Sequence, residues 1–405
     1  MTRRSLTGAG LLLAVVISFA CVHDAQASQV CVKKDSQGDW TLRIDGEPFF
    51  VRGMSYIVNP VGQSPDGMWM DWAWSDENHN GKIDGPYDAF VDKNGNNRQD
   101  PNEPSVGDFQ LMKEMGVNTI RWYQNAYPNQ RANKELFRDL YTRFGIRVAV
   151  GYYFGAYCIG SGASWEAGTD YRNTSQKQRM LASVRKMVLE HKDEPYTLLW
   201  ILGNENNYPF TQTNAGKYPV DYAKFLNEAA DTIHQIDDKH PVAFVNGAED
   251  LITYYAKYAT QIDIFGTNCY KGSSGFGVLW KTLKPVYDKP VLITEYGANL
   301  GVDDQGQAQW HLGNWNDIRR NRAGGEGAGN AIGGIAFEWL DRWWVASDPW
   351  HQAERGDAHG LGATSWNQEY GGFFSQGDGG LSPFLRRPRK VYFDYRDELW
   401  KREKK

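Results

Sequence analysis

Eight short apolar segments, each followed by an amphipathic segment, recur along the chain and constrain its fold more than any other feature. The apolar segments are rich in β-branched and aromatic residues and nearly continuous in hydrophobicity, as expected for strands buried on both faces. We predict strands at residues 49–56, 117–123, 146–154, 196–204, 242–246, 262–270, 291–295 and 332–339. We predict helices at residues 107–115, 134–144, 176–191, 221–235, 248–258, 278–287, 307–322 and 390–401.

This eightfold alternation predicts an α/β protein, specifically a (β/α)8 TIM barrel that occupies residues 28–405. Gly116 and Gly145 stand where two of the helices should end, directly before the next strand. The alternative is an open doubly wound sheet. It is disfavoured because the first strand contains Gly53-Met54-Ser55, which is not a glycine-rich phosphate turn.

Two long insertions interrupt the alternation, at residues 57–106 after the first strand and at residues 340–388 after the last strand. Both follow the carboxyl ends of strands, which is the face where TIM barrels place their active sites. The second insertion is rich in tryptophan. The whole chain contains 16 Trp and 22 Tyr, more than a core needs, and such flat amphipathic rings suit the faces of sugars.

The first residues have the features of a secretion signal. Two arginines near the start precede an apolar run at residues 11–20 and a small-x-small motif at residues 25–27. We therefore predict a signal peptide at residues 1–27, a mature chain that begins at Ser28, and export to the periplasm or the extracellular space. Lipidation at Cys21 is a weaker alternative, because the three residues before this cysteine lack the usual leucine.

Charge and cysteine content exclude several other classes of protein. The formal net charge of -5 disfavours nucleic acid as a partner, and no segment after the signal is apolar enough to span a membrane. The cysteines that follow the signal, Cys31, Cys158 and Cys269, allow at most one disulfide within the chain. Their spacing does not resemble a zinc site.

Two of the predicted strands end on a glutamate, Glu205 after the fourth strand and Glu295 at the end of the seventh. A carboxylate beside such an apolar run is costly to bury without a partner or a purpose. In a single barrel, both side chains would face the same mouth. A retaining glycosidase requires two carboxyl groups about 5 Å apart, one protonated and one ionised. A pair of metal ligands is the other use of two carboxylates, and it is less favoured because no histidine lies near either glutamate.

The segments Asn204-Glu205 and Thr294-Glu295-Tyr296-Gly297 resemble the catalytic motifs of the clan A glycoside hydrolases. The similarity extends to the barrels of families 2 and 5, and to the β-1,3-glucan-remodelling transglycosylases of family 72. The chain has no room for the β-sandwich domains usual in family 2, and it lacks the cysteine pattern of family 72. The resemblance implies that Glu205 is the acid/base, that Glu295 is the nucleophile, and that the anomeric configuration is retained.

The same resemblance implies four substrate-binding residues. Asn204 would hydrogen-bond the 2-hydroxyl of the substrate, and Arg121 on the second strand would keep the nucleophile ionised. Tyr270 on the sixth strand would hydrogen-bond the nucleophile. Trp339 on the eighth strand would form an aromatic floor beneath the sugar.

A segment of the first insertion has the spacing of an EF-hand-type calcium loop. Oxygen-bearing side chains occupy positions 1, 3, 5, 9 and 12, and the carbonyl group of position 7 completes the expected ligand set: Asp92, Asn94, Asn96, Arg98, Asp100 and Glu103. Asn97 replaces the usual glycine at position 6. A weaker loop of the same kind precedes it at residues 76–88. We therefore expect a structural Ca²⁺ ion in this insertion, with no cofactor in catalysis.

Together these features predict an exported retaining β-glycoside hydrolase that acts on a β-glucan-type polysaccharide or oligosaccharide. A β-1,3-glucan-remodelling transglycosylase with the same two glutamates is an alternative, because hydrolysis and transfer share a covalent intermediate. Alternatives of other classes are a non-catalytic carbohydrate-binding barrel and a metal-dependent hydrolase that uses the acidic loops.

Overall fold

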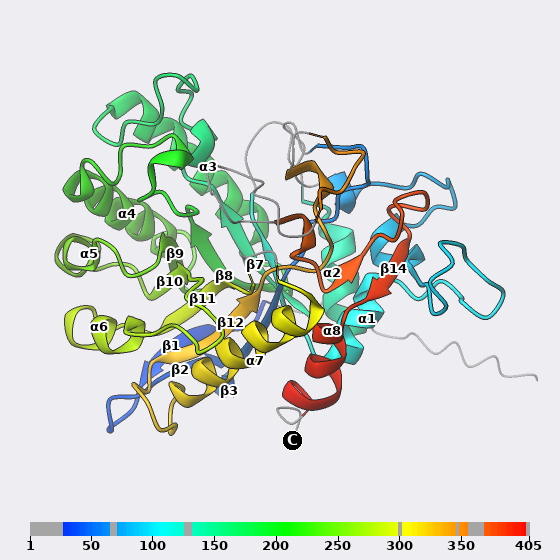
Figure 1. Cartoon of the computed structure of the whole chain (residues 1–405). Helices are drawn as coiled ribbons and strands as arrows, with labels where there is room; N and C mark the ends of the chain where they lie inside the picture. Colours follow the sequence, from blue (N-terminus) through cyan, green and yellow to red (C-terminus); the bar gives the residue numbers. More distant parts are fainter. Residues whose placement is uncertain are drawn as a thin grey trace, which may run out of the picture.

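The fold is a closed barrel of eight parallel strands surrounded by helices (Figure 1). The computed structural model describes residues 27–64, 71–124, 132–298, 302–345, 348–354 and 368–401. Around the barrel the strands follow the order β10-β11-β12-β4-β6-β7-β8-β9. Their bounds are β4 (Val51–Ser55), β6 (Thr119–Trp122), β7 (Arg147–Tyr152), β8 (Thr197–Leu202), β9 (Val242–Gly247), β10 (Ile264–Asn268), β11 (Val291–Tyr296) and β12 (Ala331–Ala336). Each overlaps a predicted strand, which confirms the TIM-barrel prediction.

The helices lie outside the barrel, as predicted. They are α1 (Asp108–Met115), α2 (Lys134–Phe144), α3 (Thr174–His191), α4 (Pro219–His234), α5 (Ile252–Tyr258), α6 (Leu279–Val286), α7 (Asp304–Arg320) and α8 (Lys390–Asp394). Gly116 and Gly145 end α1 and α2 in the left-handed conformation, with φ angles of 101° and 71°. Glycine adopts this conformation without the steric cost of a Cβ atom.

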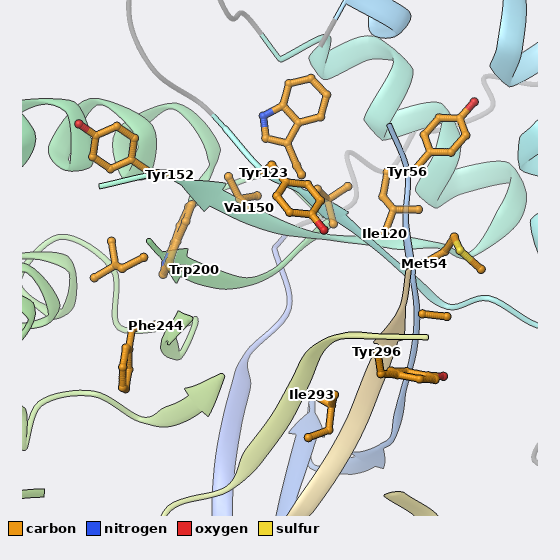
Figure 2. Packing of buried hydrophobic residues seen from close by; sticks show 14 of the residues in the cluster. Met54, Tyr56, Ile120, Tyr123, Val150, Tyr152, Trp200, Phe244, Ile293 and Tyr296 are labelled. Carbon is orange, nitrogen blue, oxygen red and sulfur yellow. The ribbon is translucent and has the colours of Figure 1, made fainter. Parts of the chain in front are cut away.

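Residues that alternate along each strand build two separate layers of the core. On β8 and β9, Trp200 and Phe244 belong to the layer between the strands and the helices, part of which is drawn in Figure 2. Leu199 and Ala243, the neighbouring residues in sequence, belong to the layer inside the barrel. Because both faces of each strand are apolar, the strands appear in the sequence as continuous apolar runs.

A small antiparallel sheet before the barrel was not predicted from the sequence. Its strands are β1 (Val30–Lys34), β2 (Trp40–Ile44) and β3 (Glu47–Phe49). Val30 and Leu42 from this sheet join the apolar layer inside the barrel. The backbone N–H of Trp40 donates to the carbonyl of Gly329, just before β12, at 2.7 Å. The sheet therefore closes the amino-terminal end of the barrel and leaves the carboxyl ends of the strands for the site.

The two insertions lie between β4 and α1 and between β12 and α8, as predicted, and a shared sheet joins them. This sheet contains β5 (Phe90–Val91), β13 (Phe374–Ser375) and β14 (Leu385–Pro388), with β14 parallel to β5. Arg386 forms a buried two-point ion pair with Asp108 of α1, at 2.7 and 2.8 Å. The insertions are therefore one structural unit beside the barrel mouth.

Residues 1–26 lie outside the described residues. They include Cys21 and all of the predicted signal peptide except its last residue. The thiols of Cys31, Cys158 and Cys269 are unpaired. None of the helices in the described ranges combines the length and the apolar character needed to cross a membrane.

Candidate active site

A β-bulge directs Glu295 into the mouth of the barrel. On a regular strand, Glu295 would lie on the same side as Ile293, which packs outward in the layer against the helices. The register between β10 and β11 shifts at this point, because Thr267 pairs with Ile293 while Asn268 pairs with Glu295. The extra residue reverses the alternation, so the Glu295 carboxylate faces inward although an apolar run precedes it.

Three donors hold the carboxylate of Glu295. Arg121 Nη1 donates to Oε1 at 2.9 Å, and the Tyr123 hydroxyl donates to the same oxygen at 2.8 Å. The Tyr270 hydroxyl donates to Oε2 at 2.9 Å. Arg121 is buried, so its charge is little screened by water. Together these donors stabilise the negative charge of Glu295 and fix the direction of both oxygens.

Both tyrosines that contact Glu295 remain hydroxyl donors. Burial raises the pKa of Tyr123 well above its ordinary value, and the negative charge of Glu295 raises it further. The same two causes raise the pKa of Tyr270. The prediction named Tyr270 and missed Tyr123, which follows β6 directly and whose hydroxyl oxygen accepts from the Ser55 hydroxyl at 2.9 Å.

Glu205 stands in a different environment, just beyond the end of β8. Gly203 and Glu205 both adopt the left-handed conformation, with φ angles of 77° and 57°. The backbone N–H of Glu205 donates to the carbonyl of Val245 at 3.1 Å, which holds this turn against β9. Burial raises the pKa of the Glu205 carboxyl above its ordinary value, and the nearby Glu295 carboxylate raises it further. Glu205 is therefore suited to keep a proton and donate it.

Asn204 connects the two glutamates through a polar network. Its Oδ1 accepts from Arg121 Nη2 at 2.9 Å and from Asn268 Nδ2 at 3.1 Å. Asn268 Oδ1 in turn accepts from the Thr294 hydroxyl at 2.9 Å. With its oxygen engaged in this way, the amide nitrogen is the part of the Asn204 side chain left to donate to another group. The structure thus brings together Glu205, Glu295, Asn204, Arg121 and Tyr270.

The prediction that Trp339 forms an aromatic floor is wrong. Its side chain is 0% exposed, and its ring packs against those of Phe374 and Tyr56, with centroids 4.6 and 6.5 Å away. Phe337, two residues earlier, is partly exposed and lies edge-on to Tyr270 at 6.2 Å. Strand β12 ends at Ala336, so alternation could not be extended to Trp339.

A second carboxylate–arginine pair borders the site and was not assigned from the sequence. Arg342 Nε donates to Glu338 Oε1 at 2.6 Å, and both side chains are buried. The Arg342 guanidinium lies over the Phe337 ring, 4.6 Å from its centroid. Burial raises the pKa of Glu338 to about 8. The signal in the sequence was an acid directly after the last strand with an arginine four residues later.

The predicted calcium loop folds around its first acidic residue. The Asp92 carboxylate accepts from the backbone N–H groups of Gly95 at 2.7 Å and Asn97 at 3.1 Å. Arg387 from the other insertion donates to the same carboxylate at 2.7 Å. Asp92 is buried, and Asn97 adopts the left-handed conformation at the usual glycine position, with φ 59°.

The remaining predicted ligands face one another in the loop. The side-chain amides of Asn94 and Asn96 donate to Asp100 Oδ2 at 2.7 and 2.9 Å. Glu103 accepts from the backbone N–H of Asp100 at 3.1 Å, and the backbone N–H of Arg98 donates to Asn96 Oδ1 at 2.9 Å. Across the part of the chain that the structure describes, no three His, Cys, Asp or Glu side chains are grouped to hold a metal ion. Calcium binding stays a prediction.

A cavity of about 730 Å³ lies beside this loop, between α1 and α8, and contains none of the residues around Glu295. Its walls include the apolar side chains of Leu111 and Phe393. The concentration of buried charge at the carboxyl ends of the barrel strands, and not this cavity, indicates where chemistry takes place.

The fold and the site define a TIM barrel of the clan A glycoside hydrolase type, with one glutamate after strand four and one at the end of strand seven of the barrel. The family described as "Glycosyl hydrolases family 2, TIM barrel domain" matches residues 94–313. The chain belongs to this family.

Solved structures of family members share the fold. The β-glucuronidase of Dictyoglomus thermophilum is 14% identical, with a TM-score of 0.52 over 92% of this chain and 53% of its own. The β-glucuronidase of Bifidobacterium dentium, complexed with coumarin-3-O-glucuronide, is 17% identical, with a TM-score of 0.54 over 92% and 49%. A putative β-galactosidase from Bacteroides fragilis is 15% identical, with a TM-score of 0.56 over 92% and 45%. This chain thus spans about half the length of these proteins. No curated protein matches its sequence.

Proposed function

We propose that this protein is a retaining β-glycosidase in which Glu205 is the acid/base and Glu295 is the nucleophile. The observation that supports this proposal best is the contrast between the two carboxyl groups. Three donors stabilise negative charge on Glu295, whereas burial and the neighbouring carboxylate raise the pKa of Glu205. Pairs of acids in such opposed environments divide the roles of base and acid between them.

The proposed reaction proceeds by double displacement. Glu295 attacks the anomeric carbon while Glu205 gives its proton to the glycosidic oxygen, so one C–O bond forms and the other breaks. In the second step, the Glu205 carboxylate removes a proton from water, and the oxygen of that water displaces Glu295. The Asn204 amide nitrogen would donate to the substrate 2-hydroxyl, because Arg121 and Asn268 hold its oxygen.

The proposed substrate is a β-glucan-type polysaccharide or oligosaccharide, and the support for it is the aromatic content of the chain and of its second insertion. Transfer to a second sugar is the alternative outcome, because a hydroxyl of another glycan can replace water in the second step. The similar structures are described as glucuronidases and a putative galactosidase, so other β-glycosides belong in the test.

The test combines small substrates with polymers. The purified protein is assayed on 2,4-dinitrophenyl β-glucoside, β-galactoside and β-glucuronide, and on β-1,3-, β-1,4- and β-1,6-glucans with analysis of the products. We expect turnover with release of the β-anomer first, observed by proton NMR, and no turnover by the Glu295→Gln variant. Binding of glycans without turnover by the parent protein would instead support the non-catalytic barrel.

We also propose that the loop at residues 92–103 binds a structural Ca²⁺ ion. The support is the EF-hand spacing of its oxygen-bearing side chains and a partial resemblance to the loop at residues 76–88, where the acceptor, Asp88, stands later in the loop than Asp100 does. There the side-chain amides of Asn78 and Asn80 both donate to Asp88 Oδ2, at 3.1 and 2.6 Å, as Asn94 and Asn96 do to Asp100. Oxygen side chains that converge at EF-hand spacing are the ligands that Ca²⁺ prefers.

Export is a further proposal, supported by the signal-like residues 1–27. Expression of the full chain followed by amino-terminal sequencing tests it. We expect the mature protein outside the cytoplasm with Ser28 as its first residue, and an uncleaved cytoplasmic product would contradict this.

A further inference from the structure

A pair of aromatic side chains lies next to Glu205 on the loop between β8 and α4. The backbone N–H of Tyr208 donates to the carbonyl of Glu205 at 2.8 Å, so the loop turns back immediately after the glutamate. The rings of Tyr208 and Phe210 have centroids 5.6 Å apart and planes inclined by 32°. Tyr208 is partly exposed and Phe210 is 38% exposed, so both rings offer surface to a ligand.

Close packing against the barrel fixes the position of Tyr208. Its ring lies on Gly247, the last residue of β9, and a Cβ atom at that position would stand 2.0 Å from the ring. Any other residue there would displace the tyrosine. Glycine therefore allows the ring to approach the end of this barrel strand closely.

The neighbouring loop, between β7 and α3, is hydrogen-bonded to the loop that carries this pair. The backbone N–H of Thr169 donates to the carbonyl of Gln212 at 2.8 Å, and that of Asn214 donates to the carbonyl of Thr169 at 3.0 Å. The short helical turns η3 (Ala156–Cys158) and η4 (Pro209–Thr211) are in contact. The aromatic wall is thus formed before any substrate binds, which lowers the entropic cost of binding.

The electrostatics of Tyr208 and of Tyr157 are consistent with positions near the Glu205 carboxyl. Burial raises the pKa of Tyr208, and the charge of Glu205 is the next largest cause. The same two causes, in the same order, raise the pKa of Tyr157, whose ring is edge-on to Tyr153 at 5.6 Å. Tyr208 and Tyr157 therefore both lie near enough to Glu205 to interact with its charge.

We propose that Tyr208 and Phe210 form the subsite that binds the sugar ring of the leaving group. The proposal rests on the assignment of Glu205 as the acid, because the group that receives its proton departs past this carboxyl. An aromatic ring at that place packs against the C–H face of a pyranose. The substrate class is therefore an oligosaccharide or polysaccharide in which the leaving group is itself a sugar.

The test compares two leaving groups in the same enzyme. Values of kcat/KM are measured for laminaritetraose and for 2,4-dinitrophenyl β-glucoside, with Tyr208→Ala, Phe210→Ala and the conservative Tyr208→Phe. We expect each alanine variant to lose about tenfold more on the tetrasaccharide than on the aryl glucoside, since stacking contributes about 1.4 kcal/mol. Tyr208→Phe keeps the ring and should retain most of the activity on both substrates. Tyr254→Ala, which removes a 37% exposed tyrosine on the outer helix α5, is the control.

Binding gives a second measurement that needs no turnover. Laminaritetraose and cellotetraose are titrated by calorimetry into Glu295→Gln and into Glu295→Gln with Tyr208→Ala, and we expect Kd to rise about tenfold in the double variant. The subsite proposal is overturned if the alanine variants lose kcat/KM equally on both substrates or on neither. It is also overturned if the tetrasaccharides do not bind. Failure of the proposed function is seen separately, as absence of turnover of every aryl glycoside by the parent enzyme.

Discussion

Arg121 Nη1 donates to Glu295 Oε1 at 2.9 Å across the inside of the barrel, from the second strand to the seventh. The other terminal nitrogen of the same guanidinium donates to Asn204 Oδ1 at 2.9 Å, beside Glu205. One buried cation therefore contacts both the candidate nucleophile and the residue before the candidate acid. Planar guanidinium geometry suits this double contact, and a lysine could not reproduce it.

Arg121→Lys should reduce activity strongly while the protein stays folded. The lysine keeps a positive charge near Glu295 but cannot also reach Asn204, so the nucleophile and the 2-hydroxyl donor lose their common support. We expect kcat/KM for an aryl glycoside to fall by about 10²-fold or more, in the range seen when a single stabilising donor is removed from an active site. Tyr123→Phe removes one of the three donors to Glu295 and should lower kcat/KM less than Arg121→Lys does. Wild-type kinetics in Arg121→Lys would contradict the role given to Arg121.

Replacement of Glu205 should affect substrates according to how much their leaving group needs a proton. Glu205→Gln removes the acid, so a sugar leaving group should react about 10²- to 10⁴-fold more slowly. Dinitrophenolate leaves without a proton, so the first step with 2,4-dinitrophenyl β-glycosides should remain fast. The second step, which needs the same residue as a base, should become slow. Stopped-flow absorbance should therefore show a burst of dinitrophenolate followed by slow turnover, and a uniform loss on both kinds of substrate would argue against Glu205 as the acid.

The alkaline side of the pH–activity profile should belong to Glu205. Burial and the charge of Glu295 raise its pKa, so the carboxyl is protonated below that pKa and loses its proton as the pH rises through it. kcat/KM for substrates with sugar leaving groups should therefore fall as the pH rises. The folded protein also binds this proton more tightly than the unfolded chain, so the free energy of unfolding should decrease as the pH rises from the ordinary pKa of a glutamate towards the raised pKa of Glu205, and level off above it. The alkaline decrease in activity should be absent in Glu205→Gln with a dinitrophenyl substrate.

The buried ion pair between Arg386 and Asp108 should be important for stability. It connects the second insertion to α1, and the Tyr56 hydroxyl also donates to Asp108, at 2.7 Å. Asp108→Asn leaves a buried guanidinium without its counter-ion, which should lower the free energy of unfolding by about 3–5 kcal/mol. The matched control is Arg143→Ala, which breaks an exposed pair with Asp139 on α2 and should cost about 0.5 kcal/mol or less. Chemical denaturation of both variants measures the difference, and equal effects would contradict the prediction.

The sequence predicted the parts of the site that depend on local pattern. Each barrel strand is a continuous apolar run, so its end could be located and Glu205 assigned to the barrel mouth, whereas Arg121 and Tyr270 were assigned through the resemblance to clan A glycoside hydrolases. Trp339 was placed wrongly because β12 ends at Ala336 and the chain beyond it no longer alternates. The bulge that turns Glu295 inward depends on pairing with β10, which periodicity within one strand does not record.

Other features were missed because they depend on contacts between distant segments. The strands β1, β2 and β3 are short and carry mostly exposed or partly exposed residues, so their apolar pattern is weak. Their burial comes from Val30 and Leu42, which fill the end of the barrel. The pairing of β5 with β14 joins insertions almost 300 residues apart in the chain, so a local sequence pattern cannot predict it.

Chelation tests whether the loop at residues 92–103 holds a structural ion. Bound Ca²⁺ would stabilise the folded state in proportion to its binding free energy, so excess chelator should lower Tm and added Ca²⁺ should restore it. Asp92 is the residue to replace, because it is buried and three backbone N–H groups and Arg387 converge on its carboxylate. Asp92→Asn preserves the shape and most of these contacts but removes the charge, so its Tm should respond little to Ca²⁺. Mg²⁺, which prefers a smaller octahedral site, is the control ion.

Activity measured well below Tm should be similar with and without chelator, because the loop is separate from Glu205 and Glu295. A Tm that does not change with Ca²⁺ would rule out the structural ion, and activity lost at once on chelation would favour a metal-dependent hydrolase.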